Sequence, residues 1–401
     1  MTLFEEIGYG LDALVVFRSL KEDPALAALN RLCHCNSYDT AGRIEAYSDM
    51  VAALYKKTDN WTDYVTDLVL TSDNLYARRY GAGEPISDSL SASLHRELKL
   101  FNRIAWLTPS QLQSQMQAQV PMQVQLASWV THPVDLNTQY SRRISSITRY
   151  GYGIYAQYHM FTLDEYGEIT PVKNPDPVTL SQLIGYQRER QVIIDNTLTL
   201  LRGKYASNVL LSGDAGTGKS ATVKAIANTY RSEGLRLIEL DRSELHYLPK
   251  IMNELCRNPL KFILFIDDLS LNEDDPDLGS LKAVLEGSTT ARVKNVVIYA
   301  TSNRRHLMKE TFDDGTDKHI NDTVQEQISL SARFGINVTF TQPDKQLYLE
   351  IAHGLARQAG IQLPDEELDR EAEKFALTKP GRSARTARQF VDQLLASQDK
   401  S

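Results

Sequence analysis

Three patterns of apolar and polar residues follow one another along the chain, and each predicts a different kind of structure. In residues 1–150, apolar side chains recur at steps of three and four, the spacing that places them on one face of an α-helix. We expect helices at Leu11–Leu20, Asp39–Lys57, Trp61–Tyr80 and Ser87–Leu107, with Thr40, Thr62 and Ser87 as N-caps. The first 150 residues therefore predict a mainly helical N-terminal domain.

One stretch of this region allows more than one interpretation. Glutamine alternates with apolar or small residues over Gln111–Gln125, a pattern also typical of a strand or of a low-complexity segment. Thr108 and Pro109 resemble a helix start, and glutamine and methionine are good helix formers. We therefore expect a helix that stops near Pro121, because proline cannot donate the next backbone hydrogen bond.

After the helical region the pattern changes to the two-residue period of a β-strand. Apolar and aromatic residues alternate over Tyr152–Phe161, a turn follows at Asp164–Gly167, and a second short strand follows at Ile169–Val172. This pattern predicts a β-hairpin. The proline-rich segment Lys173–Pro177 then marks our main domain boundary, so that residues 151–177 form a hairpin and linker.

The third pattern, over residues 178–342, alternates short apolar runs with helical segments. This alternation predicts an α/β fold, with a parallel sheet covered by helices on both faces. The expected strands are Ser207–Ser212, Leu235–Leu240, Phe262–Ile266, Val296–Ala300 and Ile336–Phe340. Residues 343–401 return to the helical period and predict a C-terminal helical lid. Its expected helices are Gln346–Gly360, Asp365–Ala376 and Ser383–Ala396.

The composition mainly excludes other classes of protein. The 401 residues are 42% hydrophobic and 24% charged, as in an ordinary globular protein of two or three domains. A formal net charge of -7 argues against a protein whose whole surface binds nucleic acid. No apolar run reaches the roughly 18 residues of a membrane span, and the N-terminus lacks a signal-peptide pattern. We therefore expect a cytoplasmic protein.

The cysteines predict neither disulfides nor a metal site. The three of them, Cys33, Cys35 and Cys256, are too few for a disulfide framework. The spacing of Cys33-His34-Cys35 does not match the usual zinc-binding pairs, and no second pair follows. We expect these residues to have a structural role.

The strongest chemical signal is the glycine-rich segment at residues 213–220, which reads Gly-Asp-Ala-Gly-Thr-Gly-Lys-Ser. It lies between an expected strand and the expected helix Ala221–Tyr230, which is the context of a phosphate-binding P-loop. Lys219 can reach the β- and γ-phosphates of a nucleotide, and the Ser220 hydroxyl can bind Mg²⁺. The predicted phosphate-binding residues are Gly213, Asp214, Ala215, Gly216, Thr217, Gly218, Lys219, Ser220 and Ala221.

Polar residues follow two of the expected buried strands. Asp267 and Asp268 come directly after Phe262–Ile266, and Asn303 follows the strand that begins at Val296. Ligands of open α/β sheets bind at the carboxyl ends of the strands. Asp267 is therefore placed to hold Mg²⁺, Asp268 to polarise an attacking water, and Asn303 to orient that water or contact the γ-phosphate. Taken alone, each is equally consistent with an ordinary polar turn.

Arginines at two places suit the same chemistry. Arg333 comes just before the last expected strand, where a guanidinium can reach a nucleotide on a neighbouring subunit; the alternative is a surface salt bridge. Arg385 and Arg388 lie about one turn apart at the start of the last helix. They either contact the γ-phosphate from the lid or form a basic helix face.

In this order the motifs resemble those of the AAA+ ATPases. The resemblance makes Gly213–Ser220 the Walker A motif and Phe262–Asp268 the Walker B motif. Asn303 then corresponds to sensor 1, Arg333 to the arginine finger and Arg385 to sensor 2. The implied fold is a P-loop AAA+ core with a helical lid, and the implied cofactors are ATP and Mg²⁺.

Longer strings resemble one family within this class, a bacterial family of predicted ATPases long described as a domain of unknown function. These strings are Leu183–Tyr186, Phe265–Ser270, Tyr299–Leu307 and Ser383–Phe390. The resemblance covers residues 150–396, and residues 1–150 match only loosely. In the first string, Ile184 and Tyr186 are implied to lie near the adenine.

The chain departs from the AAA+ pattern at two positions. Asp268 stands where many relatives have glutamate, and Ala332 stands where aspartate usually precedes the finger arginine. The first departure puts fast hydrolysis in doubt, and the second puts the orientation of Arg333 in doubt. A pore loop is also in doubt, since Tyr247 is the only aromatic residue at the relevant place. We expect that segment to begin a helix, capped by Asp241 or Ser243, with Tyr247 packed.

The resemblance implies Mg²⁺-dependent ATP hydrolysis coupled to the remodelling of a macromolecular partner, by a ring or spiral such as a hexamer. The helical N-terminal domain would bind a protein cargo or adaptor. One alternative is a nucleotide-gated assembly or binding module with little turnover. Another is a DNA-associated initiator or loader, with Arg142, Arg143 and Arg149 among the tyrosines Tyr140 and Tyr150. The acidic net charge favours a protein partner.

Overall fold

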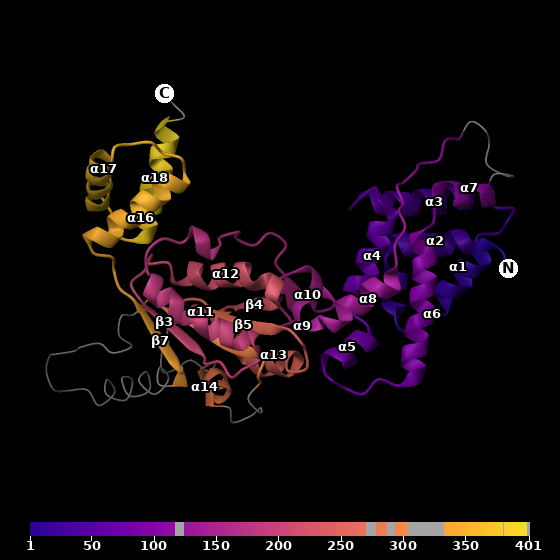
Figure 1. Cartoon of the computed structure of the whole chain (residues 1–401), viewed down its shortest axis with the longest axis horizontal. Helices are drawn as coiled ribbons and strands as arrows, with labels where there is room; N and C mark the ends of the chain where they lie inside the picture. The colour runs from indigo at the N-terminus through magenta and orange to yellow at the C-terminus, as the bar shows by residue number, and fades with distance from the viewer. Residues whose placement is uncertain (117–123, 270–277, 287–292, 304–332, 380, 399–401) are drawn as a thin grey trace. The chain divides into compact units, whose positions relative to one another are not determined.

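The computed structural model describes residues 1–116, 124–269, 278–286, 293–303, 333–379 and 381–398. The chain divides into two compact units, Met1–Gln157 and Tyr158–Ser401 (Figure 1). Each unit has its own hydrophobic core, so each is described by itself. Within the described part of the chain, none of the helices combines the length and apolar character needed to cross a bilayer.

The N-terminal unit is helical. Its α-helices are α1 (Leu3–Asp12), α2 (Pro24–His34), α3 (Thr40–Tyr55), α4 (Trp61–Thr71), α5 (Leu75–Gly81), α6 (Asp88–Ala105), α7 (Pro109–Met116), α8 (Leu136–Ser145), α9 (Ile147–Tyr150) and α10 (Ile154–Gln157). Large aromatic side chains fill the core, and Trp61, Phe17 and Phe101 are each 0% exposed. The indole N–H of Trp61 donates to the carbonyl of Ile104 at 2.7 Å, so its one polar atom is satisfied.

Two of the expected helices in this unit have the wrong bounds. The prediction of a helix over Leu11–Leu20 was wrong: the first helix, α1, begins at Leu3 and ends at Asp12. Thr2 and Glu5 form a reciprocal capping box at its start. The helix expected over Trp61–Tyr80 is split between α4 and α5, and the Asn74 side chain caps the second piece.

The expected N-caps were partly right. Ser87 caps α6 as predicted, but the caps of α3 and α4 are Asp39 and Asn60 instead of Thr40 and Thr62. The helix expected from Thr108 and Pro109 begins at Pro109, and its expected end near Pro121 lies outside the described residues.

A buried carboxylate joins the first turns of this unit to α6. Glu97 is 6% exposed, and its two oxygens accept hydrogen bonds from the backbone N–H groups of Val15, Val16 and Phe17 at 2.9 to 3.1 Å. These donors lie 80 or more residues earlier in the chain, so the carboxylate replaces the partners that a helix or sheet would otherwise supply.

We expect Glu97→Ala to destabilise the N-terminal unit by about 3 kcal/mol, because buried N–H groups lose a charged acceptor. Chemical denaturation followed by tryptophan fluorescence measures this unit alone, since Trp61, Trp106 and Trp129 are the only tryptophans of the sequence. Glu97→Gln keeps one acceptor oxygen and should lose less. An unchanged midpoint for the alanine variant would contradict the assignment.

The C-terminal unit contains a seven-stranded sheet in the order β2-β1-β4-β5-β6-β3-β7. The strands are β1 (Met160–Leu163), β2 (Ile169–Pro171), β3 (Val209–Gly213), β4 (Leu235–Leu240), β5 (Lys261–Ile266), β6 (Val296–Ser302) and β7 (Ile336–Phe340). Each neighbouring pair in this order is parallel except β1 with β2. The predicted α/β fold is confirmed, and each of the five strands expected from apolar runs is present.

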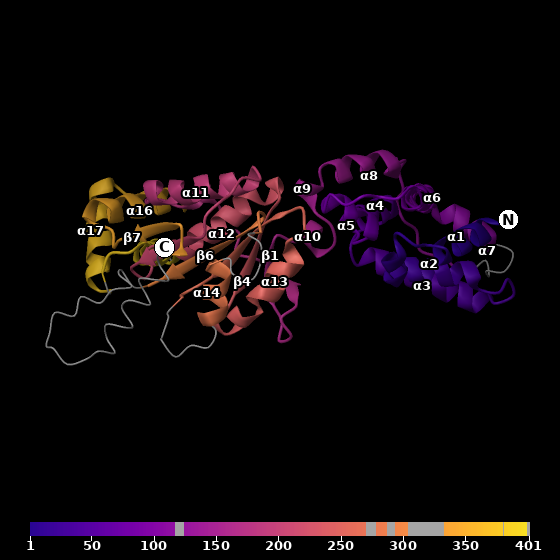
Figure 2. The same cartoon turned by 90° about the horizontal axis from the view of Figure 1, so that it is seen from below.

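Helices cover both faces of the sheet (Figure 2). They are α11 (Gln187–Leu201) and α12 (Lys219–Tyr230) on one face, and α13 (Leu248–Leu255) and α14 (Leu278–Glu286) on the other. Successive residues of each strand face opposite sides of the sheet, so Ile263 and Phe265, two positions apart, share a face and pack in the same core as α11 and α12. The strands are therefore apolar on both faces, which explains their uninterrupted apolar runs.

The β-hairpin is part of this sheet. Residues 151–177 were expected to form a separate hairpin and linker; in the structure, β1 is hydrogen-bonded in parallel to β4. Its first strand is shorter than expected, because Ile154–Gln157 form helix α10. The turn at Asp164–Gly167 is as predicted: the Asp164 side chain accepts from the N–H groups of Tyr166 and Glu168, both at 2.9 Å.

The segment after β4 packs against that turn. Asp241 and Glu244 form a capping box at the start of a 3₁₀ helix, Arg242–Tyr247, so the cap is the first of the two expected candidates, Asp241 and Ser243. The Tyr247 ring lies so close to Gly167 that an added Cβ atom would stand 2.6 Å from it. Tyr247 is therefore packed, as expected, against the hairpin.

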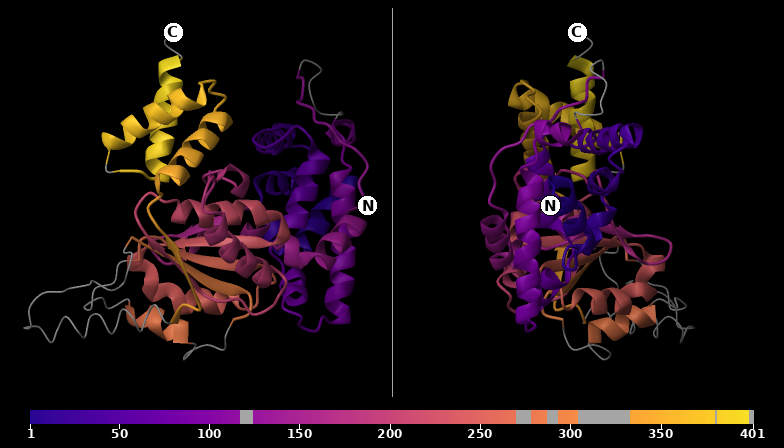
Figure 3. Two further views of the ribbon diagram at one scale, coloured as in Figure 1. Left: turned by 60° about the vertical axis from the view of Figure 1, so that its left-hand side comes forward. Right: turned by 90° about the vertical axis from the view of Figure 1, so that its right-hand side faces the viewer.

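Three helices, α16 (Lys345–Gln358), α17 (Asp365–Leu377) and α18 (Ala384–Gln398), form the C-terminal lid (Figure 3). Asp344 caps α16 through the N–H of Leu347. Tyr348 is 0% exposed, and its hydroxyl donates to the carbonyl of Ala372 at 3.0 Å, which ties α16 to α17. The lid follows β7 directly, so it begins at the edge of the sheet next to β3.

Candidate nucleotide-binding site

The glycine-rich loop connects β3 to α12 and lies against the neighbouring strand. Gly213 has φ 125°, and an added Cβ atom would lie 2.0 Å from the carbonyl oxygen of Phe340 on β7. Only glycine fits there. Gly216 has φ 78° and lies against the lid, with the N–H of Arg385 donating to its carbonyl at 3.1 Å. The loop is therefore held from both the sheet and the lid.

A cavity of about 510 Å³ opens between this loop, the carboxyl ends of β5 and β6, and the lid. The predicted site residues that line it are Ile184, Ala215, Gly216, Thr217, Gly218, Lys219, Ser220, Ala221, Asp267, Asp268, Asn303 and Arg385. The predicted residues that do not line it are Gly213, Asp214, Tyr186 and Arg333. Most of the residues selected by motif thus come together from separate stretches of the chain.

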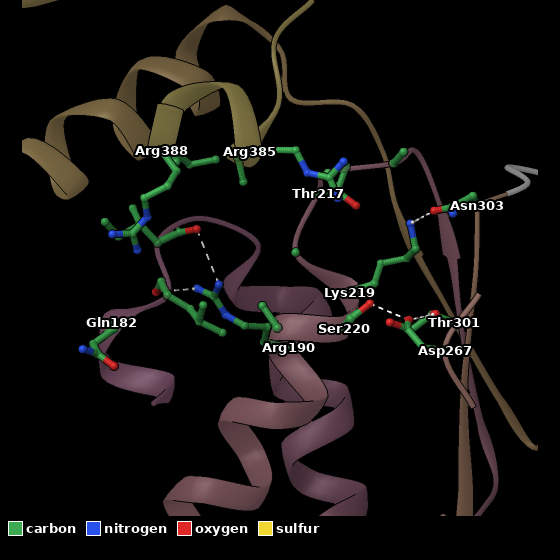
Figure 4. A pocket seen from close by; sticks show the side chains of 18 of the residues that line it. Gln182, Arg190, Thr217, Lys219, Ser220, Asp267, Thr301, Asn303, Arg385 and Arg388 are labelled. Carbon is green, nitrogen blue, oxygen red and sulfur yellow. Dashed lines mark hydrogen bonds between the residues drawn. The ribbon is translucent and has the colours of Figure 1, made fainter. Parts of the chain in front are cut away.

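Lys219 lies in the floor of this cavity and is 5% exposed. Its ammonium donates to the carbonyls of Gly213 and Asp214 at 2.9 and 2.8 Å, and to Asn303 Oδ1 at 3.0 Å (Figure 4). Burial lowers the pKa of this lysine, and the nearby carboxylates, first that of Asp214, act in the opposite direction. The ammonium is thus a partly dehydrated cation at the start of a helix.

The two acids after β5 point to different partners. Asp267 Oδ1 accepts from the hydroxyl of Ser220 at 2.6 Å and from that of Thr301 at 2.6 Å. Asp268 Oδ1 accepts from the side-chain amide of Asn303 at 2.8 Å. The two carboxylates therefore serve separate positions of one cavity, one beside the P-loop hydroxyl and the other beside the amide that follows β6.

Asp268 has a left-handed backbone, with φ 53°. Aspartate and asparagine enter this region more readily than most residues. The turn aims the side chain at Asn303 while β5 itself ends at Ile266.

Apolar side chains line part of the other end of the cavity. Ile184 lines it together with Ile351 and Leu355 from the lid helix α16. Tyr186 does not line it: its ring packs on Phe340, with centroids 5.3 Å apart, and it is 6% exposed. Its position near the adenine was expected from the resemblance; in the structure it supports the segment that carries Ile184.

Two polar residues at this end were missed by the sequence analysis. Arg190 on α11 is 8% exposed and donates to the carbonyls of Leu183 and Ile184 at 3.1 and 3.5 Å. Gln182 also lines the cavity. Gln182 directly precedes the string Leu183–Tyr186, and Arg190 follows it by four residues. Nothing in their spacing distinguishes them from ordinary surface residues of a helix or loop.

The arginines fall into two groups. Arg385 and Arg388 line the cavity from the first turns of α18. Arg333 is half-buried just before β7 and lies outside the lining of its own chain's cavity. Ala332, whose identity bears on the finger assignment, lies outside the described residues.

Comparisons with known proteins identify a family for most of the C-terminal unit. The model of a family described as "Protein of unknown function (DUF815)" matches residues 156–398. None of the curated proteins compared matches the chain.

Among solved structures, the Thermotoga maritima RuvB Holliday junction branch migration motor is 18% identical, with a TM-score of 0.38. The match covers 56% of this chain and 66% of that chain. A point mutant of the same protein is 17% identical over 56% and 67% of the two chains, with a TM-score of 0.39. Because the family model spans residues 156–398, more than half of the sequence, the chain belongs to the family described as protein of unknown function DUF815.

Proposed function

We propose that this protein is an AAA+ ATPase that hydrolyses the β–γ phosphoanhydride of ATP and couples this reaction to the remodelling of a macromolecular partner. The observation that supports it best is the convergence of three pairs in one cavity. These are Lys219 with Asn303, Ser220 with Asp267, and Asp268 with Asn303. A structural role alone would not require all of them to face the same 510 Å³ space.

The loop and Lys219 would bind the phosphates. Backbone N–H groups at the N-terminus of α12 attract anions, and the ammonium of Lys219 adds a full charge beside them. The apolar side chains of Ile184, Ile351 and Leu355 suit a nucleobase. From the lid, Arg385 and Arg388, which line the cavity, would contact the γ-phosphate.

The residues beside Lys219 fit Mg²⁺. The Ser220 hydroxyl and the Asp267 carboxylate are oxygen ligands 2.6 Å apart, and Mg²⁺ prefers oxygen. Among the described residues there is no group of three or more His, Cys, Asp or Glu that could hold a metal by themselves. Mg²⁺ bound with a nucleotide is typically held by one or two carboxylates together with phosphates. Such an ion would neutralise charge on the phosphates.

Asp268 and Asn303 would orient the attacking water. The Asn303 amide donates to Asp268 and its oxygen accepts from Lys219, so one side chain connects the acid to the phosphate-binding cation. A carboxylate that is held in place can accept hydrogen bonds from water and polarise it.

Arg333 would act on the nucleotide of a neighbouring copy. Its position outside its own chain's cavity supports this proposal, which requires a ring or open spiral, such as a hexamer. The helical N-terminal unit would then bind a protein cargo or adaptor. Base stacking by the tyrosines near Arg143 is less favoured, because Tyr140 is 3% exposed and Arg143 packs over the ring of Tyr150.

Steady-state ATP hydrolysis by the full chain, with Mg²⁺ and with EDTA, tests the proposal. Activity that requires Mg²⁺ supports it. Tight nucleotide binding without turnover would support a nucleotide-gated assembly module instead, an alternative favoured by one observation: the short Asp268 side chain is already hydrogen-bonded to Asn303.

The lowered pKa of Lys219 predicts a pH dependence of ATP binding. Only the protonated ammonium attracts phosphate, and burial brings its pKa below the ordinary 10.5. The affinity for Mg·ATP should therefore begin to fall at a pH below the range where an exposed lysine loses its proton. Titrations with a fluorescent nucleotide at several pH values measure this affinity. In the Lys219→Arg variant the guanidinium stays charged. The affinity of this variant for Mg·ATP, whether high or low, should therefore not change as the pH is raised.

A further inference from the structure

Thr301 is a buried residue of β6 that the motifs did not single out. It is 2% exposed and lies two positions before Asn303. Its hydroxyl donates to Asp267 Oδ1 at 2.6 Å and accepts from the N–H of Asp268 at 2.9 Å. We propose that Thr301 is a positioning residue that fixes both acids after β5, and that it thereby sets the affinity of the site for Mg²⁺; this inference rests on the proposed function.

The register of the sheet places Thr301 where it can do this. Ile266 on β5 pairs with Ala300 on β6, so the next residues, Asp267 and Thr301, face each other just where β5 ends. After Ile266 the hydrogen bonds of the sheet no longer hold the chain, and the Thr301 side chain on β6 makes the next contacts, with Asp267 and Asp268. The Thr301 carbonyl adds one more by accepting from the N–H of Leu269 at 2.7 Å.

Thr301 acts on the carboxylate that is suited to the metal. Asp267 Oδ1 accepts from Ser220 on one side and from Thr301 on the other, both at 2.6 Å. The two hydroxyls come from different elements, α12 and β6, so together they restrict rotation of the carboxylate. Partners that orient a metal-binding carboxylate in this way typically change metal affinity by about 10- to 100-fold when they are removed.

Thr301 also supports the unusual turn at Asp268. A residue other than glycine in the left-handed region is strained, and surrounding contacts must compensate for that strain. The hydrogen bond from the Asp268 N–H to the Thr301 hydroxyl is one such contact. One oxygen atom therefore links the metal-side acid and the water-side acid of the cavity.

Valine has nearly the shape of threonine but no hydroxyl, so Thr301→Val removes both hydrogen bonds with little change in volume. We expect the Mg²⁺ concentration for half-maximal ATP hydrolysis to rise about tenfold or more. Affinity for ATP in EDTA should stay near the wild-type value, because the P-loop does not depend on Thr301. Thr301→Ser keeps the hydroxyl and should restore most of the Mg²⁺ response.

Thr62→Val is the matched control. Thr62 lies in the N-terminal unit and is 0% exposed. Its hydroxyl accepts from the His132 N–H and lies within donating distance of the carbonyls of Ala105 and His132, at 2.8 and 3.1 Å. It should leave the Mg²⁺ response unchanged. If Thr301→Val is insoluble, Thr301→Ala takes its place.

The possible outcomes are distinct. An unchanged Mg²⁺ response in Thr301→Val overturns the inference, as does an equal loss of ATP affinity in EDTA, which would indicate a general structural role. Failure of Thr301→Ser to restore the response also overturns it. A wild-type protein that neither binds nor hydrolyses ATP would instead overturn the proposed function itself.

Discussion

Replacing Lys219 by alanine is expected to lower the affinity for Mg·ATP by about a hundredfold or more. Hydrogen bonds to charged groups contribute about 1.5 to 3 kcal/mol each, and every 1.4 kcal/mol is about a factor of ten in affinity. The ammonium is placed to make such bonds to phosphate, since it is 5% exposed and lies beside the helix N-terminus. Isothermal titration calorimetry with a slowly hydrolysed ATP analogue measures the change.

The loss should exceed that of a hydrogen bond alone because of the acids nearby. Asp214, Asp267 and Asp268 all interact with the ammonium, and without it their negative charge would repel the incoming phosphates. The alanine variant therefore removes an attraction and exposes a repulsion. Raising the ionic strength should recover part of the affinity, because salt screens the repulsion.

Lys224 provides a matched control on the same helix. It forms an ion pair with Glu239 at 2.9 Å and does not line the cavity. Lys224→Ala removes the same charge from α12 and should bind Mg·ATP as the wild type does. Equal affinities of the wild type and Lys219→Ala for Mg·ATP would contradict a phosphate-binding site at this loop.

The sheet was largely predictable because its signals are local and strong. Buried strands read as continuous apolar runs, and Leu235–Leu240 and Ile336–Phe340 have the bounds that the sequence predicted. The N-terminal helices were harder, since their ends depend on capping contacts. Asn74, for example, divides one apolar period into two helices, and its side chain also bonds to the Tyr140 hydroxyl, 66 residues away.

The site shows the same division between local and long-range information. Motifs identified the residues whose roles depend on their own strand or loop, such as Lys219 and Asp267. They did not identify Thr301 or Arg190, because the importance of each depends on strand register or on a fold-back that brings carbonyls within reach. Tyr186 shows the opposite case: its string was recognised, but its ring packs into the core instead of lining the cavity.

Asp268→Asn is expected to lower the rate of ATP hydrolysis by about a hundredfold or more and to leave Mg·ATP affinity within a factor of about two. General base catalysis contributes about 10² to 10⁴ in rate, and asparagine cannot supply it. Asparagine does tolerate the left-handed backbone at φ 53°, and its oxygen can still accept from Asn303. Single-turnover assays separate this loss of rate from any loss of binding.

Asp268→Glu tests whether the site is adapted to the shorter acid. Many proteins of the AAA+ class, which the motifs resemble, carry glutamate at the corresponding position, so the simplest expectation is that this exchange speeds hydrolysis. In this chain the residue sits at φ 53°, where glutamate is less favourable than aspartate, and the longer side chain would displace its hydrogen bond from Asn303. We therefore expect no gain over the wild type. A faster glutamate variant would mean that the turn adapts.

If the wild type turns over no faster than Asp268→Asn, the protein uses ATP as a switch for assembly, because the carboxylate then contributes nothing that an amide does not.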